Sequence, residues 1–410
     1  MSNRNLIRLN TGAPDGELFA QGIQHSYFAP EAWQVISDKI RDMQIQTQTQ
    51  NLSFGQTVTF EIDKTGTLAE DIKLDLTLSA ITGNGGGTYA RACDFLGLAL
   101  IRQVQLTYQQ NTIQTYDNNM LFLKHVRDHD ITHRQVFTSN LAGGLTPAQR
   151  NTRATAPQKV RTYVKPYWYG NKGHNPIITA LANRYKFKFQ LANLQDFIQT
   201  DYASVNCSIQ QADFVNETIN TVGDERDQFS AMTFAAKGIS YLIEDTHSTG
   251  YIKIPAGTQK IPVSLQGFVL PFSSIYFTLQ RDADVSIPYQ KKQFELPLAV
   301  FNNIDNYTFR DGTNAIFQTF HGTSDVADIY QKHHCGSQWG VYGPLGGYWA
   351  TEIADLKNVN LGSFNAANIN NFQLYIEFKA PLAEDLQLNV TLFEHNWVNH
   401  QGGEAQLIFN

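Results

Sequence analysis

Apolar and polar residues alternate strictly in two runs between residues 54 and 78, FGQTVTFEIDKTGTLAEDIKLDLTL. The apolar positions are Val58, Phe60 and Ile62 in the first run and Ile72, Leu74, Leu76 and Leu78 in the second. Successive side chains of a strand point to opposite faces, so each run predicts a strand with one buried and one polar face. Because a Gly-containing turn joins the runs, they predict an antiparallel pair.

The same alternation recurs along the chain. It is clearest in RYKFKFQLA (184–192), NNFQLYIEFKAP (370–381) and EDLQLNVTLFEHNW (384–397). Further strands are predicted at 96–108, 160–170, 207–215, 239–246, 251–254 and 261–280. About eight short strands in each half predict an all-β chain of two β-sandwiches in tandem.

Turn, capping and helix-breaking residues divide the chain into three predicted parts. Residues 1–50 are expected to form an N-terminal arm, in which PEAWQVISDKIRDM forms a short helix from Pro30 and QIQTQTQ is extended. Residues 51–222 are expected to form the first sandwich and residues 223–410 the second. The boundary is placed at a capped linker helix, GDERDQFSAMTFAAKG (about 223–238), which Gly238 closes.

Shorter elements are predicted between the strands. Asp117 is expected to cap a helix through NNMLFLKHVRD. The polar stretch from about 128 to 160 predicts an exposed loop, and residues 282–365 predict a loop-rich insertion. The GNGGG segment (83–87) has no following Lys-Ser/Thr and no strand-to-helix context, so it predicts a mobile connection between strands rather than a phosphate loop.

Composition supports a β-rich globular chain and argues against nucleic acid as a direct partner. Of 410 residues, 42% are apolar and 17% charged, and Phe (26) and Tyr (18) far outnumber Met (4). The net charge is −6 and no basic block occurs, so no direct nucleic-acid binding is expected. Neither a signal-peptide core nor a membrane-spanning run is present, which predicts synthesis as a soluble chain in the cytoplasm.

The candidates for chemistry are weak. His125, His129 and His133 share a four-residue spacing that would align three imidazoles on a helix, but Asp130, Ile131 and Thr132 disfavour a helix that continues to His133. Adjacent residues such as His333, His334 and Cys335 cannot easily converge on one metal ion. Cys93, Cys207 and Cys335 lack the spacing of a disulfide framework or a zinc site.

A glycosidase-like sandwich would need a pair of acids, for which Glu352 with Asp355, or Glu394 alone, are the candidates. No pair stands out from ordinary strand-end carboxylates, so no catalytic, cofactor or metal site is predicted and the chain is not expected to be an enzyme.

The order of the motifs resembles a known family. FGQTVTFEIDKTGTLAEDIKLDLTL resembles the opening strands of the first jelly roll in the major capsid proteins of nucleocytoplasmic large DNA viruses and their virophage and polinton-like relatives. ACDFLGLALIRQVQLTYQQNTIQTYD and YVKPYWYGNKGHNPIITALANRYKFKF resemble the next strands, and VNETINTVGDERDQFSAMTFAAKGISYLIEDT the inter-domain helix and following strand. NLGSFNAANINNFQLYIEF and HNWVNHQGGEAQLIFN are similar to the end of the family pattern.

The resemblance implies two tandem eight-stranded antiparallel jelly rolls with short helices and long loops. It implies a homotrimer that forms a pseudo-hexagonal capsomer in the icosahedral capsid of a double-stranded DNA virus. Minor capsid or penton proteins and, through the N-terminal arm, an internal membrane would be further partners. Trp168, Trp339 and Trp349 are expected to pack sandwiches or subunits together. The alternative is a carbohydrate-binding or glycosidase-like sandwich, such as a virion fibre or receptor-binding component.

Overall fold

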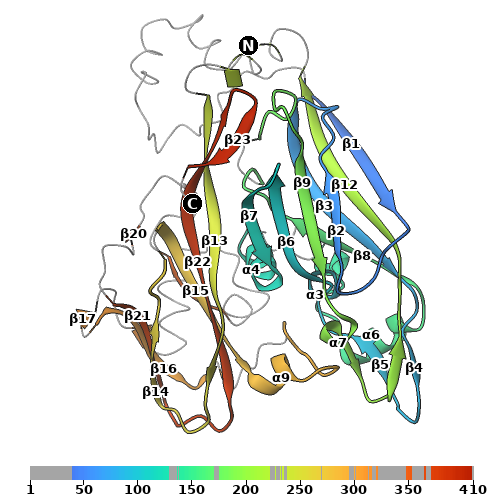
Figure 1. The fold of residues 1–410 in the computed structure, drawn as a ribbon. Coiled ribbons are helices and arrows are strands. Elements are labelled where there is room, and N and C mark those ends of the chain that lie inside the picture. Colours follow the sequence, from blue (N-terminus) through green and yellow to red (C-terminus); the bar gives the residue numbers. More distant parts are fainter. Residues whose placement is uncertain are drawn as a thin grey trace, which may run out of the picture.

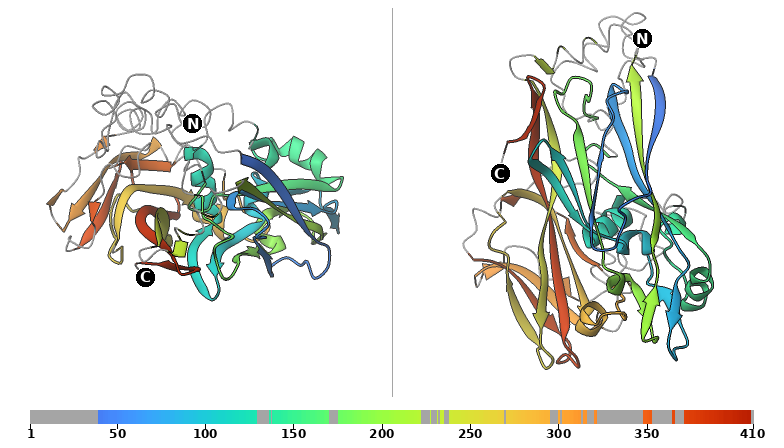
Figure 2. Two further views of the ribbon diagram at one scale, coloured as in Figure 1. Left: turned by 90° about the horizontal axis from the view of Figure 1, so that it is seen from above. Right: turned by 45° about the vertical axis from the view of Figure 1, so that its right-hand side comes forward.

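The computed structural model describes residues 39–128, 138–169, 175–221, 238–268, 270–294, 302–312, 348–352, 364–365 and 371–408, with a few isolated or paired positions between them. Two antiparallel β-sandwiches stand side by side (Figure 1), and their long strands run in roughly the same direction. Seen from above, the strands of the first half and those of the second half lie on opposite sides, with β6, β7 and α4 between them (Figure 2). The predicted all-β double jelly-roll fold is confirmed.

The first sandwich consists of two four-stranded sheets in the described part of the chain. Sheet 1 has the order β1-β12-β3-β8, and sheet 2 has the order β2-β9-β6-β7. The strands of sheet 1 are β1 (Lys39–Gln48), β12 (Ile209–Thr221), β3 (Leu68–Leu78) and β8 (Gln158–Val164). The strands of sheet 2 are β2 (Thr57–Glu61), β9 (Tyr185–Leu191), β6 (Ile101–Tyr108) and β7 (Asn111–Asp117).

The two strands predicted from residues 54–78 exist, but they do not pair with each other. β2 pairs with β9 in sheet 2, whereas β3 pairs with β12 and β8 in sheet 1. The buried faces of the two sheets lie opposite each other across the core. The ring of Phe60 on β2 stacks on that of Phe214 on β12, the neighbour of β3, with ring centroids 5.0 Å apart. The turn between them therefore crosses from one sheet to the other, as jelly-roll connections do.

The second sandwich repeats this plan. Sheet 3 has the order β13-β22-β15-β19, with β20 (Phe364–Asn365) beside β15 and β23 (Glu404–Leu407) beside β22. Sheet 4 has the order β14-β21-β16-β17, with β18 (Phe320–His321) beside β16. The other strands are β13 (Ile239–Ile254), β22 (Leu386–Gln401), β15 (Pro271–Arg281), β19 (Tyr348–Glu352), β14 (Lys260–Ser264), β21 (Phe372–Phe378), β16 (Ile304–Asp311) and β17 (Asn314–Ala315). The alternating runs β21 and β22 again fall in opposite sheets.

β1 contradicts part of the predicted N-terminal arm. The helix predicted from Pro30 would have continued to Met43, but Lys39–Gln48 form a strand that pairs with β12 without a register shift. Gln44, Gln46 and Gln48 alternate with more exposed neighbours, so the period of two prevails over the helical pattern. Lys39–Gln48, which were expected in the arm, thus belong to sheet 1, and residues 1–38 lie outside the described residues.

Two predicted strands have different bounds. The run 96–108 splits into a short helix, α3 (Leu96–Ala99), and β6. All four residues of α3 are buried, and a fully buried apolar run does not distinguish a helix from a strand. Conversely, the runs 239–246 and 251–254 form one long strand, β13, with a register irregularity between Ser248 and Tyr251 where Gly250 has φ +69°.

The segments predicted as loops contain regular structure. Within 128–160, α6 (Pro147–Ala154) begins at Thr146, whose side chain forms a reciprocal capping box with Gln149, and Leu141 is buried. The Thr-Pro-x-Gln start is a helix signal that the polar composition of this stretch concealed. Within 282–365, the described residues include α9 (Asp282–Ser286) and strands of both sheets of the second sandwich.

The predicted cap of α4 (Asn118–Asp128) is confirmed, because the Asp117 carboxylate accepts a hydrogen bond from the backbone N–H of Met120 at 2.7 Å. In the predicted linker helix, the described residues Asp227, Ala231, Thr233 and Phe234 are helical. The domain boundary at this helix stays a prediction.

The hydrophobic core shows how the sandwiches are joined. One buried cluster fills the second sandwich, between sheets 3 and 4. A second and larger cluster fills the first sandwich and also includes Tyr241, Tyr276, Phe393 and Val398 from sheet 3. The first core therefore continues into the second half of the chain.

Candidate assembly surfaces

A cluster of aromatic side chains joins the two sandwiches where β22 ends. His400 is fully buried, and its Nε2 lies 2.6 Å from the Tyr185 hydroxyl of sheet 2 and 3.3 Å from the Tyr167 hydroxyl. The ring of Tyr241 on β13 packs edge-on against the imidazole, with centroids 4.8 Å apart. Burial lowers the pKa of His400 to about 3, so the imidazole is neutral at physiological pH.

The turn after β22 closes the same junction through its backbone. The carbonyl oxygen of Gly403 accepts hydrogen bonds from the Tyr108 hydroxyl and the Ala182 N–H, each at 2.7 Å. The Tyr108 oxygen in turn accepts from the N–H of Asn183 at 3.1 Å. We define the junction cluster as Tyr108, Tyr167, Tyr185, Tyr241 and His400.

A segment of the second half also crosses onto the lower end of the first sandwich. The backbone of Tyr289 exchanges hydrogen bonds with Gln195 and Thr200, and Lys291 pairs with Asp196 at 2.6 Å. Phe294 then packs on Phe122 of α4, with ring centroids 5.1 Å apart. The sandwiches are thus joined at two separate places along their length.

A polar cleft of about 620 Å³ lies beside the second of these places, with Asp196 and Lys291 in its lining. Its lining includes Asp117, Asn118, Asn119, Tyr251 and Gln293. The amides of Asn118 and Gln293 hydrogen-bond each other at 2.8 and 3.1 Å, and Asn119 donates to the Tyr251 hydroxyl at 2.7 Å. These side chains hydrogen-bond one another across the two halves of the chain, so the network helps to hold the sandwiches together.

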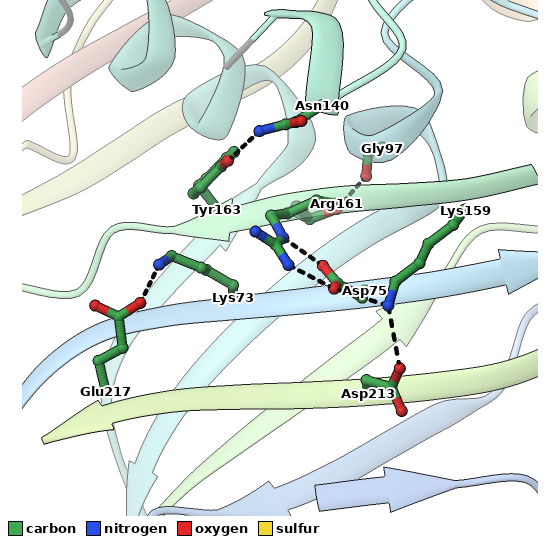
Figure 3. Close-up of polar contacts among 10 residues, drawn as sticks. Lys73, Asp75, Gly97, Asn140, Lys159, Arg161, Tyr163, Asp213 and Glu217 are labelled. Carbon is green, nitrogen blue, oxygen red and sulfur yellow. Dashed lines mark hydrogen bonds and ion pairs between the residues drawn. The ribbon is translucent and has the colours of Figure 1, made fainter. Parts of the chain in front are cut away.

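The outer face of sheet 1 carries a ladder of charged side chains (Figure 3). Asp75 on β3 accepts two hydrogen bonds from Arg161 on β8, at 2.6 and 2.7 Å, and lies 3.2 Å from Lys159 Nζ. Lys159 also reaches Asp213 on β12 at 3.4 Å, and Asp213 accepts from Thr47 of β1 at 2.8 Å. The ladder therefore spans all four strands of the sheet.

Electrostatics within this ladder favours the charged forms. Hydrogen bonding to Asp75 raises the pKa of Arg161. Burial alone would raise the pKa of Asp213, but hydrogen bonds from Gln211, Thr47 and Lys159 hold it below its ordinary value. Lys73 and Glu217 form a further ion pair on the same face (Figure 3). The charges are paired within the sheet, so this face offers little free positive charge to a phosphate backbone.

β1 leaves an apolar strip beside the ladder. Met43 and Ile45 are 58% and 56% exposed, and β1 pairs only with β12 among the described strands. On the second sandwich, Trp397 and Ile408 are 38% and 50% exposed. Each sandwich thus presents an apolar surface that its own described residues leave open to solvent.

The predicted histidine and cysteine candidates form no described metal site. His125 is buried in α4 and lies 3.2 Å from the Thr138 hydroxyl, whereas His129 and His133 lie outside the described residues. The same is true of His333, His334 and Cys335. Among the residues that the structure describes, no group of three His, Cys, Asp or Glu side chains could hold a metal ion. Cys93 is buried and Cys207 is partly buried.

The acidic candidates are not brought together as a described pair. Glu394 on β22 is buried and lies 3.5 Å from His247, whose pKa is raised mainly by its hydrogen bond to Glu394. The backbone of Glu352 belongs to β19, and Asp355 lies outside the described part of the chain. A buried carboxylate paired with histidine is a structural contact, and it supplies no catalytic pair.

The glycine segment at 83–87 is more ordered than predicted. Gly83 belongs to β4 (Thr82–Asn84), which pairs with β11 (Ser204–Asn206). A Cβ atom on Gly83 would lie 2.2 Å from the Tyr202 ring. The glycine is needed because an aromatic side chain packs directly on the backbone.

Of the three tryptophans expected to pack sandwiches or subunits, Trp168 lies in the core of the first sandwich. It is buried, donates to the Glu70 carbonyl at 2.6 Å and packs against Tyr167 and Tyr185. The backbone of Trp349 lies in β19, and Trp339 falls outside the described residues.

Sequence reasoning missed the junction cluster. Its tyrosines come from segments far apart in the chain, and no local spacing links them. One signal was available: His400 has the same parity as the buried positions Leu388, Val390 and Val398 of its strand. A histidine on the apolar phase of a strand indicates a buried imidazole.

In the described part of the chain, no helix has the length and apolar character of a membrane span.

Part of the chain matches a known protein family. Residues 39–232 match the family described as major capsid protein N-terminus. No curated protein matches the chain in sequence. The fold is similar to that of VP54 from the virus PBCV-1, with a TM-score of 0.69 and 17% identity over 94% of this chain and all of that one.

Two further solved structures share the architecture. The Faustovirus major capsid protein matches with a TM-score of 0.67 and 9% identity over 97% of both chains. A chain of the Sputnik virophage matches with a TM-score of 0.57 and 11% identity over 93% of this chain and 91% of that one. Residues 39–232 thus match the N-terminal part of major capsid proteins, and the chain as a whole shares the double jelly-roll fold of these solved structures.

Proposed function

We propose that this protein is the repeating unit of an icosahedral capsid of a double-stranded DNA virus, and that three copies form a pseudo-hexagonal capsomer. The observation that carries the proposal is the continuous core of the first sandwich, which includes buried side chains of sheet 3. Because this core holds the two sandwiches side by side, three chains would present six similar sandwiches around one axis.

A closed ring of three identical chains needs two unlike surfaces that fit each other. The first sandwich offers the open edge of β1 with Met43 and Ile45, and the second offers Trp397 and Ile408. Covering an open strand edge also removes a site for uncontrolled pairing with other chains. These features support self-association through the flanks of the two sandwiches.

The other proposed partners follow from the location of such a subunit in the capsid shell. The protein would be made in the host cytoplasm and reside in the virion capsid, in contact with neighbouring capsomers and with minor capsid or penton proteins. The N-terminal arm would contact an inner layer such as a membrane. Direct contact with the genome is not expected, because the net charge is −6 and the charges on sheet 1 are paired.

Size-exclusion chromatography with light scattering tests the proposal on the full chain. The expected result is a stable particle of three times the 46.1 kDa chain mass, with hexagonal outlines in electron micrographs. A monomer at micromolar concentration would contradict the capsomer. A monomer that also binds oligosaccharides would favour the carbohydrate-binding alternative.

A further inference from the structure

The junction cluster places a neutral histidine where the two sandwiches meet. His400 is 0% exposed, and the groups around it come from β9, from the segment after β8 and from β13. The titratable groups that face it are Tyr167, Tyr185 and Tyr241, and burial raises the pKa of each, so all three are uncharged near neutral pH.

The described polar partners of this imidazole are neutral hydroxyls, which would not compensate a positive charge on it. Nε2 already lies within hydrogen-bond distance of the Tyr185 hydroxyl, and Nδ1 has no hydrogen-bond partner among the described residues. The carboxylate of Glu404 bonds Gln109 at 2.6 Å at the rim of the junction. Lys64 donates a hydrogen bond to the Ala182 carbonyl at 2.9 Å.

We propose that His400 makes the docking of the two sandwiches sensitive to acid, so that protonation of this histidine releases the β22–β23 turn from the first sandwich. Among the described residues no carboxylate contacts His400, so an imidazolium in this pocket would be a buried charge that the described contacts do not neutralise, and such a charge is costly. Opening exposes the imidazole to water and removes that cost.

The sign of the pH dependence follows from linkage. The pKa of His400 is lowered in the docked state to about 3, against 6.5 for a solvated histidine. Docking is therefore fully stable above pH 6.5 and weakens as the pH falls from 6.5 towards 3. Between pH 7.5 and 5.0 the opening equilibrium rises about 30-fold, because each pH unit below 6.5 is worth about tenfold.

Amide hydrogen exchange on the full chain measures this opening directly. The reporter is the Ala182 N–H, which donates to the Gly403 carbonyl across the junction. After correction for the intrinsic exchange rate, protection of the peptide that contains Ala182 is expected to fall about 30-fold between pH 7.5 and 5.0. Peptides within sheet 1, such as that of Leu74, serve as an internal reference.

Two variants separate His400 from other titrating groups, which include the partly buried His395 and Asp245. In His400→Gln, a neutral amide replaces the imidazole, and the fall in protection is expected to shrink to less than about threefold. The control His247→Gln changes an exposed histidine and should keep the full pH dependence. Equal falls in wild type and His400→Gln would overturn the proposal.

The wild-type profile alone is also decisive if His400→Gln does not fold. The logarithm of the Ala182 protection should fall with a slope near one proton per pH unit below pH 6.5. A flat profile between pH 6.5 and 4.5, with the reference peptides unchanged, would contradict the proposal. The result does not depend on trimer formation, so it is distinguishable from failure of the proposed capsomer.

Discussion

Asp75 shows how a charged residue can lie on the outer face of a sheet and still be almost completely buried. Its side chain is 3% exposed because Arg161 and Lys159 cover it from β8. The two hydrogen bonds from Arg161 use the planar fork of the guanidinium, which restricts the relative position of the two strands. The ladder therefore contributes to strand register as well as to charge balance.

Replacing Asp75 by Asn should lower the free energy of unfolding by about 1–3 kcal/mol, because the amide keeps the shape but removes the carboxylate that pairs with Arg161 and one of the two carboxylates near Lys159. Urea denaturation of the full chain at neutral pH measures the change. The matched control is Glu61→Gln, since Glu61 is 41% exposed and pairs with Lys186 at 2.8 Å on sheet 2. Its expected effect is below about 0.5 kcal/mol, and equal effects of the two variants would contradict the assigned role of Asp75.

At the scale of the elements, the period of two predicts strands well wherever one face is buried and the other polar. β9 and β21 follow their predicted alternation residue by residue. Pairing partners could not be predicted in this way, because alternation reports which face is buried and not which strand lies alongside. For this reason β2 and β3 were assigned as a pair although they belong to opposite sheets.

The segments that were predicted wrongly have specific physical causes. α3 is buried on all sides and carries no amphipathic signal, and the polar surface of α6 concealed a complete N-terminal capping box. The absence of a catalytic role for the candidate histidines and acids stays a prediction, and the junction cluster depends on tertiary contacts. Only the strand phase of His400 pointed to it.

The β4–β11 pair offers a prediction at this scale. Gly83→Ala should destabilise the protein by about 1–3 kcal/mol, because the new methyl group would overlap the ring of Tyr202. Gly86→Ala is the control, since a Cβ atom there would meet nothing within 4 Å. Thermal unfolding compares the two variants with wild type. A loss of stability in Gly86→Ala that equals that of Gly83→Ala would contradict this packing.

At the scale of the whole molecule, the shared core makes the two sandwiches one cooperative unit. Side chains of sheet 3 complete the first core, and the segment with Phe294 adds a second attachment. Neither the first sandwich nor sheet 3 would keep its buried surface if the halves separated. Unfolding of one half should therefore destabilise the other.

Calorimetry of the full chain should show a single unfolding transition for wild type. Phe294→Ala removes contacts with Phe95 and Phe122 and is expected to broaden or split the transition, because the lower attachment is weakened. The control is Ile287→Ala in the same segment, where the side chain is 40% exposed. Two resolved transitions in wild type would contradict the shared-core description.

The pairing of early and late strands has a consequence for how the protein is made. β1 can pair only after β12 has been synthesised, since Lys39 lies opposite Thr221, and β13 waits for β22, since Ile239 lies opposite His400. During translation, long apolar strands therefore remain unpaired on the ribosome while much of their sheet is still missing. Folding is therefore expected to be slow, because non-local strand pairing loses loop-closure entropy before it gains contacts. Chaperones are expected to protect the unpaired strands from aggregation during this time.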